Sequence, residues 1–233
     1  MVTSEHTLNA SFAIGVHELP EYQPMLNRCL DFLHITQVRE NVPNVDRVYR
    51  HPSAGGFPFS TRDCGWIVSD CTAEGLKAAM ALQEMPFAPA GRFSEVDLTQ
   101  AADVLLSYQN DDGGFGTYDR RRASPMLEAL NPAEVFGDIM VEYSYVECTS
   151  AVAQGLTAFR KRFPKYRASE IELAMQRAKL YIESMQRDDG SWYGAWGVCF
   201  TYGTMFGIDG LAQYGLHYGN RCAANGPNNG IGC

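Results

Sequence analysis

The chain has 233 residues, of which 45% are hydrophobic and 20% are charged, as in a globular protein with a substantial core. Its formal net charge of −8 leaves no basic excess to neutralise phosphates, so we expect no nucleic-acid partner. The seven cysteines contain no C-x-x-C pair, which predicts reduced intracellular thiols rather than a disulfide framework or a metal site. No secretory signal pattern and no membrane-spanning apolar run is recognisable.

Helical spacing of apolar residues recurs along most of the chain. It predicts helices over residues 25–37, 69–83, 96–109, 145–163, 169–186 and 200–214. Ser169 and Glu172 have the spacing of a capping box, which would begin the fifth of these helices. Residues 1–20 are a weakly patterned start and residues 219–233 an irregular tail, so we expect the helical domain to span 21–218.

Two unrelated motifs repeat with one period. The dipeptide Cys71–Thr72 recurs as Cys148–Thr149, and a Gln-x3-Gly-x-aromatic motif begins at both Gln109 and Gln186. Both separations are 77 residues (148 minus 71, and 186 minus 109). Helix pairs repeated in this way stack their apolar faces on one another, so the sequence predicts an all-α fold, an α/α solenoid or toroid. The Gln amide is expected to bind the turn while the aromatic ring packs on it.

The segment 55–78 carries a group of reactive side chains at the start of a predicted helix. Asp70 and Thr72 flank the thiol of Cys71, and Glu74 follows one turn later. Apolar surroundings favour the protonated form of a carboxyl group, which makes Asp70 a candidate general acid. The alternative is that Asp70 only caps the helix, and the residues alone leave both interpretations open.

The run Asp-Cys-Thr-Ala-Glu at 70–74, the Gln-x3-Gly-x-Phe/Trp repeats and the segments GGFPFSTRDCGW, NPAEVFGDIM, YVECTSA and WGVCFTYGT resemble the oxidosqualene cyclase (terpene cyclase/mutase) family. The resemblance extends from about residue 12 to about residue 215 and implies an incomplete α/α barrel. Cys64 and Val68 match the lanosterol-type members, since cycloartenol-type members tend to have His and Ile at these positions.

The resemblance implies isomerase chemistry, the cyclisation of 2,3-oxidosqualene to a lanosterol-type sterol, with neither cofactor nor metal. Asp70 would protonate the epoxide, and Cys71 and Cys148 would donate hydrogen bonds to its carboxyl group. Such donors stabilise the carboxylate that remains after proton transfer. Glu74 would lie behind Asp70 and help to reprotonate it through water.

Aromatic rings would stabilise the carbocations of this cascade through their quadrupoles. Phe59 and Tyr118 match wall residues of the family, and Tyr118 would also orient the base that takes the final proton. For Phe59 the alternative is plain core packing. For Cys71 and Cys148 it is the role of a small buried hydrophobic residue.

The sequence also departs from the family. Family chains are far longer, and the histidine that acts as their final base lies N-terminal to the matching region, outside the context of His6, His17, His34, His51 and His217. We therefore expect the chain to be a piece of a cyclase and to be inactive alone. By resemblance, it would associate with a membrane surface as a monotopic protein, at the endoplasmic reticulum or a lipid droplet.

Three other functions are alternatives to this one. The first is a non-catalytic helical-repeat protein that binds lipid or a partner. The second is a glycosidase that pairs Asp70 with Glu74 or Glu147, which conflicts with apolar walls and flanking thiols. The third is a protein prenyltransferase, which would need a zinc ligand set that the sequence lacks.

Overall fold

The computed structural model describes residues 18–48, 50–134, 137–197 and 200–215, and its regular structure in these ranges is entirely helical. The α-helices are Gln23–Thr36 (α2), Ser69–Gln83 (α3), Glu95–Ser107 (α4), Val146–Arg162 (α5), Ala168–Ser184 (α6) and Phe200–Ala212 (α7). Short 3-10 helices are Pro20–Tyr22 (η2), Val45–Arg47 (η3), Arg62–Cys64 (η4) and Pro125–Leu130 (η5). The all-α prediction is confirmed, and all six predicted helices are present. Most of the predicted start and the whole predicted tail lie outside the described residues.

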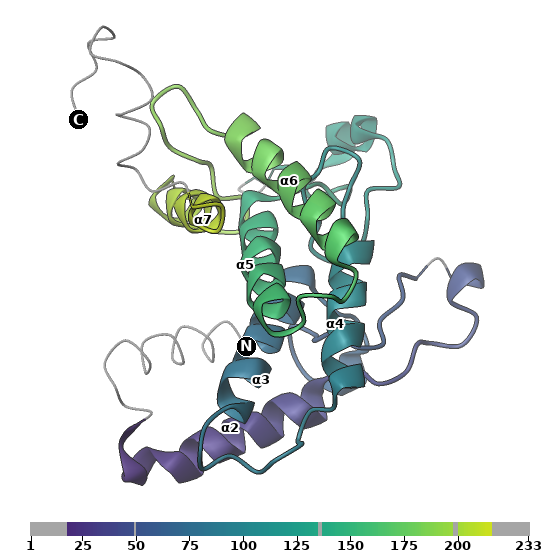
Figure 1. Ribbon diagram of the computed structural model, residues 1–233. Helices are drawn as coiled ribbons and strands as arrows, with labels where there is room; N and C mark the ends of the chain where they lie inside the picture. Colours follow the sequence, from purple (N-terminus) through teal and green to yellow (C-terminus); the bar gives the residue numbers. More distant parts are fainter. Residues whose placement is uncertain (1–17, 49, 135–136, 198–199, 216–233) are drawn as a thin grey trace, which may run out of the picture.

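The helices form two layers, as the repeat predicts. The first helices of successive units, α3, α5 and α7, pack side by side, and α3 also packs on α2. The second helices, α4 and α6, cover α3 and α5 from one side (Figure 1). Each unit therefore buries its apolar face against its own second helix and against the next unit. The beginnings of α3 and α5 are brought together at one end of this stack.

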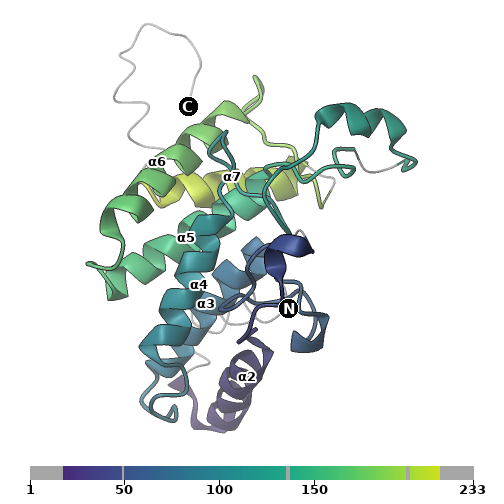
Figure 2. The same ribbon diagram turned by 90° about the vertical axis from the view of Figure 1, so that its right-hand side faces the viewer.

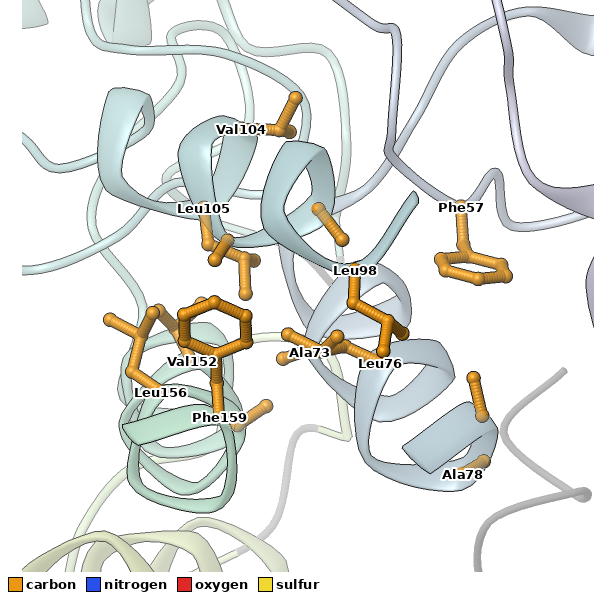
Figure 3. Packing of buried hydrophobic residues seen from close by; sticks show 14 of the residues in the cluster. Phe57, Ala73, Leu76, Ala78, Leu98, Val104, Leu105, Val152, Leu156 and Phe159 are labelled. Atoms are coloured by element: carbon orange, nitrogen blue, oxygen red, sulfur yellow. The ribbon is translucent and has the colours of Figure 1, made fainter. Parts of the chain in front are cut away.

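The core lies between α3, α4 and α5. Figure 3 shows Leu76 of α3, Leu105 of α4 and Phe159 of α5 pointing into one apolar cluster, and all three are fully buried. Burying a side chain of this size stabilises a fold by about 1.5–3 kcal/mol. A Cβ at Gly155 of α5 would lie 2.9 Å from the Cβ of Ala73, so small residues set the close approach of α5 to α3.

The Gln-x3-Gly-x-aromatic motif closes each unit as predicted. In the first unit, Gln109 Nε2 donates to the carbonyl of Gly113 at 2.9 Å and to that of Ala174 in α6 at 2.8 Å. Gly113 has a φ of +90°, and a Cβ there would lie 2.6 Å from the carbonyl oxygen of Arg177. The motif aromatic, Phe115, is fully buried. The first motif therefore ties its own turn to the second helix of the next unit.

The second copy of the motif makes only the local part of these contacts. Gln186 Nε2 donates to the carbonyl of Gly190 at 3.0 Å, and Gly190 has a φ of +85° with nothing within 4 Å of its missing Cβ. Trp192 is buried and its Nε1 donates to the carbonyl of Ile182 at 2.8 Å.

The capping box predicted at Ser169 and Glu172 is wrong. Arg167 adopts a left-handed conformation with a φ of 43° and serves as the N-cap, so α6 has already begun when the chain reaches Ser169. A capping box is present instead at α4, where Ser94 Oγ accepts from the amide of Asp97 at 3.2 Å and Asp97 Oδ2 accepts from the amide of Ser94 at 2.8 Å.

One segment projects from this body. Figure 2 shows η5 and its flanks extending away from the stacked helices. Met126 and Leu130 of η5 are 83% and 70% exposed, and Ile139 nearby is also exposed.

Candidate active site

Asp70 is the second residue of α3 and lies at the end of the molecule where α3 and α5 begin. Its Oδ1 accepts a hydrogen bond from the amide of Cys71 at 2.6 Å. The N-cap position belongs to Val68, so Asp70 is not the N-cap residue itself, although its carboxyl group binds an amide of the first turn. Burial raises the pKa of Asp70, although hydrogen bonds from the amide and thiol of Cys71 pull the pKa down. Asp70 is therefore a carboxyl group that tends to keep its proton.

The thiols of Cys71 and Cys148 have different hydrogen-bond partners. Cys71 is buried and its thiol is hydrogen-bonded to the Asp70 carboxyl group. Cys148 is fully buried in α5, where its Sγ lies 3.4 Å from Thr117 Oγ1 and is also hydrogen-bonded to Ser69. Desolvation raises the pKa of Cys148, and negative charge on Asp70 raises it further, so the two groups are neighbours. The direct hydrogen bond from Cys148 to Asp70 stays a prediction.

Glu74 lies one turn after Asp70 on the same helix. Its Oε2 is 3.0 Å from Lys77 Nζ, and both side chains are mostly buried. The position of Glu74 one turn behind the acid is the one expected for reprotonation, and that role stays a prediction.

Aromatic side chains are exposed around the start of α3. Phe59 is 58% exposed, so the alternative of core packing is wrong for this residue. Tyr118 is 38% exposed, and its pKa is raised by burial and by negative charge on Asp70. Rings that reach solvent beside a protonated acid are free to contact a ligand.

The two residues proposed as product markers are placed differently. Cys64 is exposed at the end of η4. Val68 is buried directly before α3. Cys64 therefore lies at the surface, whereas Val68 belongs to the core.

Two further aromatic residues belong to this surface and were missed by sequence reasoning. Trp196 is 40% exposed, and its Nε1 donates to Thr117 Oγ1 at 3.0 Å. Trp66 meets Tyr118 edge to face at 6.4 Å, while the guanidinium of Arg50 lies 4.0 Å from the Trp66 ring centroid. That ring already holds a cation, so Trp66 is better suited to orient Tyr118. A Trp four residues after the motif Trp was the only signal for Trp196.

One buried and one half-buried carboxyl group bind backbone amides close to the exposed aromatic residues. Glu147, the second residue of α5, is only 2% exposed, and its Oε1 accepts from the amide of Trp196 at 3.0 Å. Burial raises the pKa of Glu147, and negative charge on Asp70 raises it further. Burial likewise raises the pKa of Glu142 to about 7, although hydrogen bonds from the amides of Thr117 and Tyr118 lower this pKa. Sequence analysis did not point to Glu142, and it named Glu147 only as a carboxylate partner of Asp70 in the glycosidase alternative.

A chain of Ser107, His51 and Asp119 resembles a hydrolase triad but does not support that chemistry. His51 Nε2 lies 2.6 Å from Ser107 Oγ, and His51 Nδ1 lies 3.4 Å from Asp119 Oδ1. Ser107 is the last residue of α4, and its hydroxyl donates to the carbonyl of Val104 at 2.6 Å. A helix C-terminus presents carbonyl groups rather than the amide donors that an oxyanion requires. These contacts instead join the end of α4 to the loop that carries Tyr118.

Two kinds of feature are absent from the described ranges. No group of three or more His, Cys, Asp or Glu side chains there is arranged to hold a metal ion. None of the helices in the described part of the chain has both the length and the apolar character to cross a membrane.

Comparison with known proteins gives consistent matches. Residues 5–224 match the family described as the squalene-hopene cyclase C-terminal domain. Lanosterol synthase of Mus musculus is 50% identical over 223 residues, which cover 92% of this chain and 30% of the mouse protein. Cycloartenol synthase of Dictyostelium discoideum is 46% identical over 213 residues, which cover 90% of this chain and 29% of that protein.

A solved structure also matches. The type II terpene cyclase MstE from Scytonema, in complex with geranylgeranyl dihydroxybenzoate, superposes with a TM-score of 0.51 at 17% identity, covering 88% of this chain and 47% of that chain. The prediction of an α/α toroid is confirmed by this likeness and by the family match. The chain spans about 30% of the length of the curated relatives that it matches.

Proposed function

Because the chain belongs to the squalene-hopene cyclase C-terminal domain family, we propose that it supplies the proton-donating part of a cyclase that converts 2,3-oxidosqualene to a lanosterol-type sterol. The 50% identity to a lanosterol synthase supports this substrate and product over the glycosidase and prenyltransferase alternatives. The identity to a cycloartenol synthase is only slightly lower, at 46%. The assignment of a lanosterol-type product therefore depends also on Cys64 and Val68.

The observation that carries the proposal is the state of Asp70. Burial raises its pKa, and the groups that oppose this shift, the amide and the thiol of Cys71, are hydrogen-bond donors. A carboxyl group of this kind holds its proton until a base of sufficient strength arrives, and the same donors stabilise the carboxylate once the proton has left. The positive end of the α3 dipole acts in the same direction.

The proposed first step is protonation of the epoxide oxygen. As the Asp70 proton moves to this oxygen, the C–O bond breaks, its electron pair stays on oxygen as a hydroxyl group, and the neighbouring alkene supplies the electrons for the first new C–C bond. Asp70 is left as a carboxylate. The step moves one proton and needs neither cofactor nor metal.

The positive charge then moves along the folded substrate. Phe59, Tyr118 and Trp196 offer exposed rings, and each ring stabilises a nearby cation by roughly 0.5–2 kcal/mol. Water would quench such a cation, so the surface must be covered during reaction. We propose that this face is one wall of a closed cavity in the complete cyclase.

We also propose contact with a membrane surface, at the endoplasmic reticulum or a lipid droplet. The support is chemical, since the proposed substrate is a hydrocarbon that partitions into lipid. The exposed apolar side chains of η5 and its flank, Met126, Leu130 and Ile139, are candidates for that contact. Flotation of the chain with phosphatidylcholine vesicles tests this proposal, and replacing Met126 and Leu130 by serine should reduce the bound fraction.

The catalytic proposal is tested in a chimera in which residues 21–218 replace the matching segment of mouse lanosterol synthase. Turnover of 2,3-oxidosqualene to a tetracyclic alcohol is expected. A folded chimera that binds a substrate analogue without turnover would instead favour the non-catalytic lipid-binding alternative. The isolated chain serves as the comparison, and we expect it to be inactive.

A further inference from the structure

The dipeptide Thr117–Tyr118 connects nearly every part of the candidate site. The carbonyl of Thr117 accepts from the amide of Ser69, the first residue of α3, at 2.9 Å. Thr117 Oγ1 accepts from Trp196 Nε1 at 3.0 Å and lies 3.4 Å from Cys148 Sγ. Tyr118 follows directly, and its partly exposed ring meets the Trp66 ring edge to face at 6.4 Å. A displacement of this dipeptide would therefore move two wall rings and one thiol together.

Glu142 holds the backbone of this dipeptide. Its Oε1 accepts from the amide of Thr117 and, at 3.1 Å, from the amide of Tyr118. The approach depends on Gly116, because a Cβ at that position would lie 2.9 Å from Glu142 Cγ and 3.0 Å from Glu142 Oε1. A side chain at position 116 would thus push the carboxyl group away from the two amides.

In the second unit of the repeat, a different carboxyl group binds the amides of the equivalent loop. There the loop after the Gln-x3-Gly-x-aromatic motif is held by Glu147, the second residue of α5, which accepts from the amide of Trp196. Position 196 corresponds to position 119 of the first unit (196 minus 77), so the two loops are equivalent. In the first unit Glu142 accepts from the loop amides, and Asp70, the equivalent of Glu147, accepts from the amide of Cys71 instead.

We infer that Glu142 is a positioning residue of the site: by binding the amides of Thr117 and Tyr118 it fixes both the Tyr118 ring and the Thr117 hydroxyl, and it leaves the Asp70 carboxyl group free of the loop. The inference concerns the site of the proposed cyclase and rests on that proposal for its functional meaning. Its structural content is independent of catalysis and can be measured on the chain itself.

The experiment compares Glu142→Ala, Glu142→Gln and Glu95→Gln in the ¹⁵N-labelled 233-residue chain. Trp196 and Trp192 provide two indole N–H signals, assigned with Trp196→Phe and Trp192→Phe. In Glu142→Ala the Trp196 indole and the amides of Thr117 and Tyr118 should shift, while the Trp192 indole, which donates to Ile182, should stay in place. Glu142→Gln keeps an oxygen acceptor and should restore all three signals. The exposed Glu95→Gln should shift none of them.

Unmoved Trp196, Thr117 and Tyr118 signals in a folded Glu142→Ala chain would overturn the inference. If Glu142→Ala does not fold, Glu142→Asp decides instead: its shorter side chain keeps the charge but cannot reach both amides, so the same signals should shift, and their persistence would overturn the inference. Equal effects of Glu142→Gln and Glu142→Ala would also contradict it, because charge rather than position would then matter. None of these readouts requires turnover, so failure of the proposed cyclase activity would be seen separately in the chimera.

Discussion

Asp70 and Glu147 are equivalent residues of the 77-residue repeat, the second residues of α3 and α5, but their carboxyl groups have different partners. Glu147 Oε1 accepts from the amide of Trp196 at 3.0 Å, whereas Asp70 Oδ1 accepts from the amide of its own neighbour Cys71 at 2.6 Å. One repeat position has therefore given a loop-holding residue in one unit and a candidate proton donor in the other.

The raised pKa of Asp70 predicts a cost in stability. A carboxyl group whose pKa is higher in the folded chain than in the unfolded chain binds more protons in the folded chain. Its contribution to stability is therefore fully present below its ordinary pKa, and it is lost as the pH rises through the raised pKa. Asp70→Asn removes this loss and keeps an oxygen for the amide of Cys71. We expect the unfolding free energy at pH 8 to rise by about 1 kcal/mol, as for other functional groups held in unfavourable surroundings.

Urea unfolding of both proteins at pH 4 and pH 8 measures this effect. The advantage of Asp70→Asn should shrink at pH 4, where the wild-type carboxyl group is protonated in the folded chain and about half protonated in the unfolded chain. An equal difference at the two pH values would show that Asp70 does not titrate abnormally.

Glu142 should give a second pH dependence, in a defined window. Burial raises its pKa from 4.5 to about 7, so stability should fall as the pH rises from about 4.5 to above 7. A shift of this size corresponds to at most about 3 kcal/mol, and less where solvent reaches the group. The slope should be smaller in Glu142→Gln than in the wild type between pH 5 and pH 8. Parallel slopes in urea titrations would contradict the raised pKa.

The two motif glycines provide a matched pair. Both Gly113 and Gly190 have positive φ angles, of +90° and +85°, but only at Gly113 would a Cβ strike backbone, that of Arg177 at 2.6 Å. We expect Gly190→Ala to cost about 1 kcal/mol for the backbone conformation, and Gly113→Ala to cost at least about 1 kcal/mol more for the displaced helix. Thermal unfolding of the two variants checks the order, and equal costs would contradict the close packing of the first motif on α6.

The two cysteines should contribute unequally to catalysis in the chimera. The Cys71 thiol is hydrogen-bonded to Asp70, whereas Cys148 is bonded to Thr117 and Ser69. Removing a hydrogen bond that stabilises a developing charge costs about 1.5–3 kcal/mol, or roughly 10- to 100-fold in rate. Cys71→Ala should therefore reduce kcat by such a factor and Cys148→Ala by less. The opposite order would mean that Cys148 reaches Asp70 during the reaction.

Sequence reasoning succeeded where a local pattern decides the structure. Apolar spacing located all six helices, and the repeat predicted how the motif glutamines bind their turns. The start of α6 was misjudged because Arg167, a residue without turn preference, adopts the left-handed conformation that ends the preceding turn. Nothing in a single sequence marks such a position.

The site was only partly predictable, for a physical reason. Asp70 and Cys71 are adjacent in the chain, and Cys148 follows from the repeat, so these three were accessible to sequence analysis. The contacts of Glu142 with Thr117 and of Trp196 with Thr117 join residues that are 25 and 79 positions apart. Only the packing of α3 on α5 brings these loops together, so their relation becomes visible in the folded chain alone.

The most direct test of the central claim is the turnover of 2,3-oxidosqualene by the chimera with and without Asp70→Asn, with circular dichroism confirming that both proteins are folded. We predict that the chimera forms a tetracyclic alcohol and that Asp70→Asn abolishes this product without loss of helical content. Retained turnover in the folded Asp70→Asn chimera would contradict the assignment of Asp70 as the proton donor.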